Sequence, residues 1–106
     1  MTIKYHILFR ACDKVESVHK AVRPYGLNKT EVIKVSFFSM YHAIKSENYL
    51  FTIIGDDLSD ELLDFFQLFD NVVVENEKLG SASKSLQKQI DLALIIPDDE
   101  WVYMCE

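Results

Sequence analysis

The chain has 106 residues, of which 49% are hydrophobic and 26% are charged, and its formal net charge is −6 at pH 7. This composition excludes a disordered chain and fits one domain, residues 1–106, with a buried core. The acidic balance argues against nucleic acid as a partner. The apolar runs are too short for a transmembrane segment, and the start of the chain does not resemble a secretory signal. With only two cysteines, we expect reduced thiols and a cytoplasmic location.

The first third of the chain predicts a strand, a loop and a helix. Ile3–Phe9 is apolar and rich in β-forming residues, which predicts a strand. Residues 14–29 have no clean period and contain the turn signal Arg23-Pro24-Tyr25-Gly26, so we expect a long loop. Asn28 and Glu31 have the spacing of a capping box. The helix behind them has apolar positions that we expect to be largely buried: Val32, Val35, Phe37, Phe38, Met40, Tyr41, Ala43 and Ile44.

A second strand and helix follow. Tyr49–Ile54 is a continuous apolar run, which predicts a strand that is covered on both faces and ends at Gly55. Ser59 is a good N-cap for a helix over Asp60–Phe69. Val72–Val74 then predicts a short third strand.

The last quarter predicts one more helix and one more strand. The helix starts near Gly80 and ends at Pro97, and its apolar positions at helical spacing are Leu86, Ile90, Ala93 and Leu94. Trp101–Cys105 predicts a fourth strand, and we expect Trp101 to lie in the core.

This alternation predicts an α/β fold: a mostly parallel, open, Rossmann-like sheet of about four strands with flanking helices. Ligands of such sheets bind beyond the carboxyl ends of the strands. We therefore expect four polar segments to meet at that edge: Arg10–Asp13, Gly55–Asp57, the turn after Val74, and Glu106.

Familiar cofactor and metal motifs are absent from the sequence. It has no GxGxxG fingerprint and no P-loop, and His6, His19 and His42 are scattered. Cys12 has no CxxC partner that would support redox chemistry. Carboxylates at strand ends remain, and these can accept hydrogen bonds from a ligand or bind a hard cation.

Four pieces of the chain, in order, resemble the nucleotide-binding half of GT-A glycosyltransferases of the large family 2 type. The most specific is Phe51-Thr-Ile-Ile-Gly-Asp-Asp-Leu-Ser-Asp60, which resembles the second strand and its Asp-Asp-x-Ser-x-Asp turn. Ile7–Asp13 is similar to the first strand and its loop, and Asn76–Gly80 to an Asn-x-Gly segment. Asp99–Glu106 is similar to the strand that enters the acidic Asp-x-Asp motif.

The resemblance implies a nucleotide-binding set of residues. Asp57 would accept the ring N–H of the base, as a carboxylate can for uracil, while Asp56 would orient the turn. Arg10 would touch base and ribose or reach phosphate, with Asp13 beside it. Lys84 would contribute positive charge to the diphosphate.

The resemblance also implies a metal and a missing half. Glu106 would fall at the first position of the acidic motif, or just before its metal-binding Asp, and the intact family enzyme would use Mg²⁺ or Mn²⁺. The catalytic base and the acceptor-binding half would lie outside this chain. We therefore expect the nucleotide-diphosphate-sugar-binding part of a glycosyltransferase, truncated before the acceptor half and inactive alone.

A non-catalytic interaction or receiver-like domain is the alternative. It too alternates strands and helices and carries paired acids, but a receiver-like domain places that pair after its first strand, whereas Asp56 and Asp57 follow the second. An open sheet edge or apolar face makes a homodimer a further expectation.

Overall fold

Strands and helices alternate as the sequence predicts over residues 3–13 and 26–106, which the computed structural model describes. The strands are β1 (Tyr5–Ala11), β2 (Tyr49–Asp56), β3 (Val72–Glu77) and β4 (Trp101–Cys105). The helices are α1 (Lys29–Ile44), α2 (Asp60–Phe66) and α3 (Ala82–Leu94). Most of the loop expected over residues 14–29, including the turn at Arg23–Pro24, falls outside the described residues.

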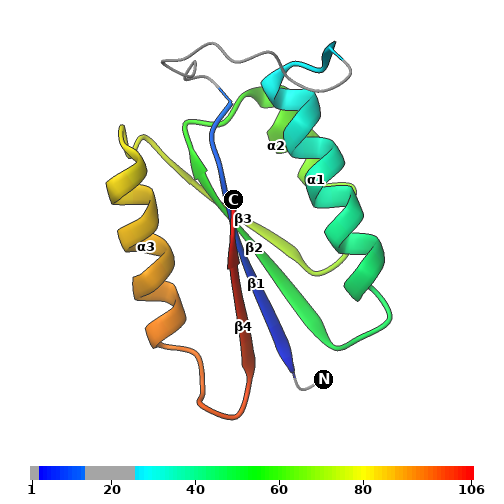
Figure 1. The fold of residues 1–106 in the computed structure, drawn as a ribbon, viewed down its shortest axis with the longest axis vertical. Helices are drawn as coiled ribbons and strands as arrows, with labels where there is room; N and C mark the ends of the chain where they lie inside the picture. Colours follow the sequence, from blue (N-terminus) through cyan, green and yellow to red (C-terminus); the bar gives the residue numbers. More distant parts are fainter. Residues whose placement is uncertain (1–2, 14–25) are drawn as a thin grey trace.

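The four strands form one parallel sheet in the order β3-β2-β1-β4. Helices α1 and α2 cover one face and α3 covers the other (Figure 1). The predicted Rossmann-like α/β fold is therefore confirmed. No described helix combines the length and the apolar character that crossing a lipid bilayer requires.

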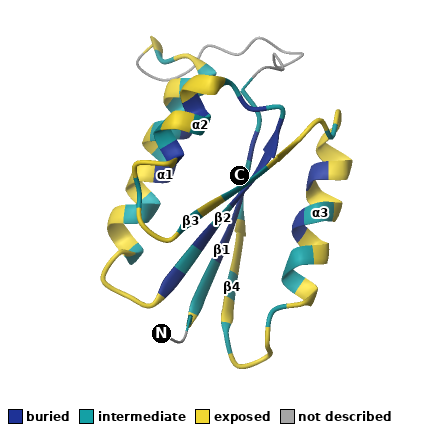
Figure 2. Ribbon diagram, turned by 180° about the vertical axis from the view of Figure 1, so that it is seen from behind, coloured by how far each residue is buried: buried dark blue, intermediate teal, exposed yellow. Residues whose placement is uncertain are grey.

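The core lies between the sheet and the pair α1 and α2, and Phe37 of α1 is at its centre. The Phe37 ring is fully buried, and its centroid lies 5.0 Å from that of Phe51 and 5.1 Å from that of Phe66. Both contacts are edge-to-face, the arrangement that aromatic quadrupoles favour. Figure 2 shows the buried residues concentrated in β1, β2 and the inward sides of the helices.

Capping fixes where two helices begin. The Asn28 side chain accepts the N–H of Glu31, and the Glu31 carboxylate accepts the N–H of Asn28, so the predicted capping box is confirmed. The Ser59 hydroxyl accepts the N–H of Leu62 and caps α2 as expected.

The sequence-based bounds of β4 are confirmed, whereas those of β1, β2 and β3 ended too early and that of α2 ended too late. β1 continues to Ala11, β2 to Asp56 and β3 to Glu77, because main-chain pairing with the neighbouring strands continues through polar residues. Helix α2 ends at Phe66 rather than Phe69. Arg10 and Asp56 are therefore strand residues, held more rigidly than loop residues would be.

The apolar residues at helical spacing in α3 do not form its buried face. Leu86, Ile90 and Leu94 are exposed, whereas Ser85 and Gln89 are buried. The Gln89 amide donates to the carbonyl oxygens of Leu8 (2.7 Å) and Cys105 (3.2 Å), so α3 packs on the sheet through a satisfied polar contact.

Three large hydrophobic side chains that we expected to be buried are exposed. Trp101 is 63% exposed, because β4 is an edge strand that neither helix layer covers fully. Val35 and Phe38 lie on the outer side of α1 and are also exposed.

Gly55 allows β2, α2 and β3 to approach closely. A Cβ at this position would lie 2.6 Å from Leu58 Cδ1 and 2.8 Å from Asn76 Oδ1. The Asn76 oxygen accepts the N–H of Leu58, so it cannot retreat without breaking that bond.

We predict that Gly55→Ala destabilises the fold by about 1–3 kcal/mol, as overpacking typically does. Urea unfolding gives the measurement, and Ser46→Ala at an exposed turn should change it by less than about 0.5 kcal/mol. An unchanged midpoint for Gly55→Ala would contradict the tight fit.

Candidate functional site

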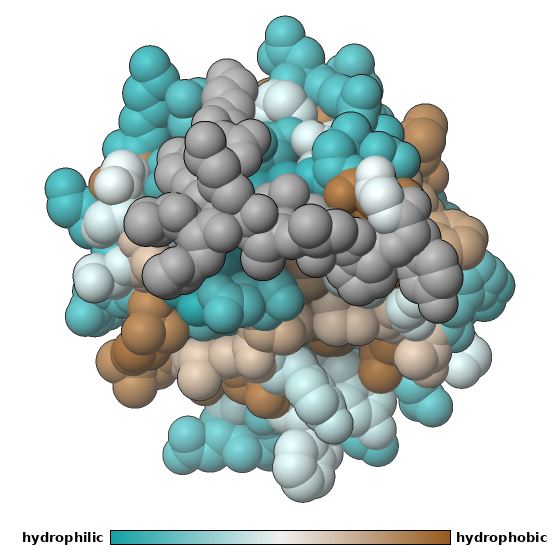
Figure 3. Space-filling view, turned by 45° about the horizontal axis from the view of Figure 1, so that its top comes forward, coloured by the Kyte–Doolittle hydropathy of each residue, from teal (hydrophilic) through white to brown (hydrophobic). Residues whose placement is uncertain are grey.

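A cavity of about 390 Å³ lies at the carboxyl end of β1, between the first turns of α1 and α3. Its described lining comprises Arg10, Ala11, Cys12, Lys29, Ile33, Asp56, Gly80, Ser81, Ala82, Ser85 and Glu106. The chain leaves β1 toward β2 on one side and returns to β4 on the other, so the cavity sits where the strand order reverses. Open α/β sheets bind ligands at this point. Figure 3 turns this end toward the reader and shows hydrophilic residues beside hydrophobic ones.

The buried Asp56 carboxylate fixes one wall of the cavity. It accepts the N–H of Leu79 (2.8 Å) and of Gly80 (3.1 Å), which lie just before α3. Gly80 adopts a left-handed backbone (φ 80°), a conformation that suits glycine. Asp56 therefore holds the start of α3 against the end of β2.

Arg10 and Glu106 meet in the cavity although 96 positions separate them in the sequence. The Arg10 Nη2 donates to Glu106 Oε2 at 2.5 Å, and Nη1 donates to the Ala82 carbonyl at 3.2 Å. β1 and β4 are parallel neighbours, so their carboxyl ends are adjacent. The expected meeting of polar groups at this edge holds for Arg10, Asp56 and Glu106.

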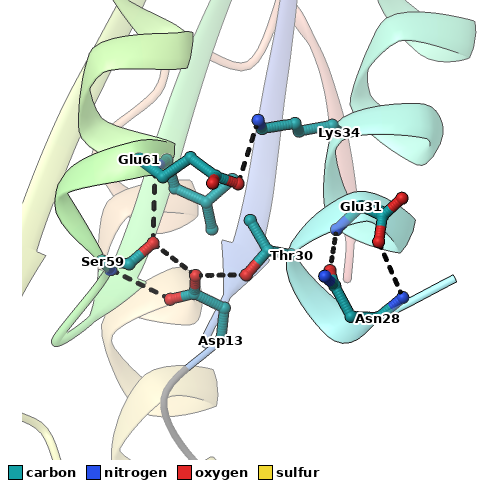
Figure 4. Close-up of polar contacts among 8 residues, drawn as sticks. Asp13, Asn28, Thr30, Glu31, Lys34, Ser59 and Glu61 are labelled. Carbon is teal, nitrogen blue, oxygen red and sulfur yellow. Dashed lines mark hydrogen bonds and ion pairs between the residues drawn. The ribbon is translucent and has the colours of Figure 1, made fainter.

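Asp13 joins the loop after β1 to two helix starts rather than lining the cavity. It accepts hydrogen bonds from the Ser59 N–H (3.0 Å), the Ser59 hydroxyl and the Thr30 hydroxyl (2.8 Å; Figure 4). Burial raises the pKa of Asp13, but these hydrogen bonds outweigh it and hold the pKa below its ordinary value.

Asp57 and Lys84 also lie outside the described lining. Asp57 has a left-handed backbone (φ 51°), and its N–H donates to the Glu77 carbonyl, so it turns the chain out of β2. Lys84 is an exposed residue of the first turn of α3. The structure thus brings together three of the six residues expected in the site.

Sequence reasoning missed the contribution of α1 and α3 to the cavity. Lys29 and Ser85 line it, and neither belongs to a strand end. Ser85 had one signal in the sequence: it is a small polar residue one turn after the N-cap Ser81, which places it near whatever the helix start faces.

Both cysteines are free thiols in separate environments. Cys12 lines the cavity. Burial raises the pKa of Cys105, so its reactive thiolate is scarce at neutral pH.

The described residues do not complete a metal site. No three His, Cys, Asp or Glu residues among them are grouped to hold an ion, and the Glu106 carboxylate is engaged by Arg10. Mg²⁺ or Mn²⁺ binding therefore stays a prediction.

Comparison of the chain with protein-family models, with curated proteins and with solved structures found no match. The fold and the cavity therefore define an open, parallel α/β domain with a cavity at the point where the strand order reverses.

Asp56→Asn should loosen the wall formed by the start of α3. An amide offers one oxygen and no negative charge, so we expect a loss of about 2 kcal/mol in stability. Amide hydrogen exchange at Leu79 and Gly80 should accelerate by roughly tenfold or more. Asp99→Asn in an exposed turn is the control, and equal exchange in the two variants would overturn this role.

The lowered pKa of Asp13 makes the free energy of unfolding depend on pH. Because its pKa is lower in the folded state, its ionised form stabilises the fold above roughly pH 4, and this contribution is lost as the pH falls further. Asp13→Asn should therefore be less stable than wild type at pH 7, with a smaller difference near pH 3. Urea unfolding at both pH values tests this, with the exposed Asp64→Asn as control. A constant difference would disprove it.

Proposed function

We propose that the chain binds a nucleotide-diphosphate sugar and is the donor-binding part of a glycosyltransferase. The observation that carries the proposal is the cavity at the carboxyl end of β1, with Arg10 and Lys29 in its lining. The strand order β3-β2-β1-β4 supports it, since it equals the first four strands of the doubly wound order whose switch point binds nucleotides.

The proposal divides the ligand between two neighbouring strand ends. Asp57, at the end of β2, accepts the ring N–H of the base, as the resemblance implies. Arg10, at the end of β1, faces the diphosphate, and its planar guanidinium suits paired oxygen acceptors. Lys84 adds positive charge at the start of α3. Asp56 acts by holding Leu79 and Gly80 in place.

Asp13 has no direct role in this arrangement. Its carboxylate is occupied by Ser59 and Thr30, so we assign it the task of fixing the loop after β1.

The chemistry of transfer is divided between this chain and the rest of an intact enzyme. Transfer would need a divalent cation to offset the charge of the leaving diphosphate, and it would need a carboxylate outside this chain to deprotonate the acceptor hydroxyl. The residues described here bind and orient the donor, so the chain alone should show no turnover. The free thiols of Cys12 and Cys105 fit a cytoplasmic enzyme.

Thermal unfolding with UDP or GDP, with and without Mn²⁺, tests donor binding. A nucleotide that binds only the folded chain raises Tm, by the equivalent of about 2.7 kcal/mol at a hundredfold excess over Kd. Asp57→Asn should abolish the shift while tolerating the left-handed backbone, because Asn also adopts it readily. Asp60→Asn, three residues away, is the control.

A shift of equal size in Asp57→Asn would remove Asp57 from the site. The absence of any shift with either nucleotide would favour the second candidate function, an interaction module.

Exposed apolar residues favour that second candidate. Lys88 of α3 pairs with Glu77 of β3, so the opposite flank of α3, with Leu86 and Ile90, faces toward β4. Met104 of β4 is 53% exposed on the same side of the sheet. An apolar surface of this kind, beside an open strand edge, suits a homodimer.

A further inference from the structure

The Arg10 guanidinium is incompletely satisfied. Nη1 and Nη2 have partners, but Nε is buried and has none among the described residues. A buried N–H without a partner costs about 1–3 kcal/mol, so its persistence calls for an explanation such as an absent acceptor.

Ser85 of α3 is a second polar group in the lining of the cavity. The residue is only 7% exposed. It lies on the side of α3 that faces the sheet, where a small apolar residue would also pack. A hydroxyl in such a place can donate a hydrogen bond to a ligand in the cavity.

The start of α3 supplies further hydrogen-bond donors. Ser81 is its N-cap, and the N–H groups of the first turn have no carbonyl partners within the helix. Together with the helix dipole they favour an anion, and α3 has 13 residues, long enough for this effect.

The Glu106 carboxylate lies against Arg10, where an anionic ligand would bind. Its side chain is 72% exposed, whereas that of Arg10 is 16% exposed. An exposed carboxylate in such a pair contributes little net stability, so a better acceptor can replace it.

We propose that this cavity binds a phosphate or diphosphate group without a metal, through Arg10, Ser85 and the start of α3, and that Glu106 is displaced when it binds. Identifying the group as the diphosphate of a sugar donor rests on the proposed function, whereas the anion site itself does not. A tetrahedral oxyanion has enough acceptors for Nε, Nη2 and the Ser85 hydroxyl at once.

Titration of the full chain with pyrophosphate, in a chelator and at constant ionic strength, tests the site. Ser85→Ala should weaken binding roughly three- to tenfold, because it removes one hydrogen-bond donor from the cavity lining, and it should leave the chain folded. Arg10→Lys should weaken it more than tenfold, since lysine has no fork of donors. Lys88→Gln removes a charge of α3 that pairs with Glu77, away from the cavity, and should leave binding within twofold.

Glu106→Gln shows whether the Glu106 carboxylate competes with the anion for Arg10 or instead helps to bind the anion. We expect pyrophosphate to bind several-fold more tightly to this variant, because the internal competitor is neutral. Cys12, which also lines the cavity, provides an independent readout: pyrophosphate should slow its alkylation, and Ser85→Ala should need a roughly three- to tenfold higher concentration for the same effect. Unchanged binding in both Ser85→Ala and Arg10→Lys, or weaker binding in Glu106→Gln, would overturn the proposal.

Adding uridine and UDP separates this proposal from the proposed function. If pyrophosphate binds with these dependencies but UDP binds no more tightly, the anion site stands and the nucleotide proposal fails. If UDP binds equally well to wild type, Ser85→Ala and Arg10→Lys, the anion site fails and nucleotide binding stands.

Discussion

Two hydrogen bonds to the Asp56 carboxylate organise the end of the molecule where the strands finish. By accepting the N–H groups of Leu79 and Gly80, Asp56 fixes the direction in which α3 begins. On the other face, Gly55 leaves room for Asn76 to reach Leu58 and so positions the start of α2. Successive residues of a strand point to opposite faces, so two adjacent positions of β2 place two helices. The placement of α3 also forms one wall of the cavity, which Gly80, Ser81, Ala82 and Ser85 line.

The sequence was sufficient for the elements and the fold class, for local physical reasons. Alternation of strands and helices, the capping box at Asn28 and the N-cap at Ser59 depend on neighbours a few residues away. The buried face of α3 depends instead on Gln89, whose partners are carbonyls of β1 and β4. The spacing of the apolar residues within α3 does not indicate this distant contact, so the sequence alone does not reveal which side of α3 faces the sheet.

The sequence predicts the position of a site residue only where the strand topology alone determines it. Arg10 and Glu106 meet because they end, or directly follow, neighbouring parallel strands. Asp13 and Asp57 follow their strands too, but the chain has turned by then, and side-chain partners such as Ser59 and Thr30 decide where the carboxylate of Asp13 goes. Strand-end chemistry can thus be placed from sequence to within a residue or two, while the direction of a side chain in the following loop cannot.

Charge balance in the cavity bears directly on what it can bind. Four charged side chains line its described part, and Arg10 and Lys29 offset Asp56 and Glu106. Asp56 is buried and held by two backbone N–H groups, so its charge is fixed in place, whereas Glu106 is mostly exposed and can turn toward solvent. Movement of this one side chain changes the lining from neutral to net positive next to a helix start. Under the proposed displacement, the cavity would accept a negative group at little electrostatic cost, whereas in the structure Glu106 is paired with Arg10.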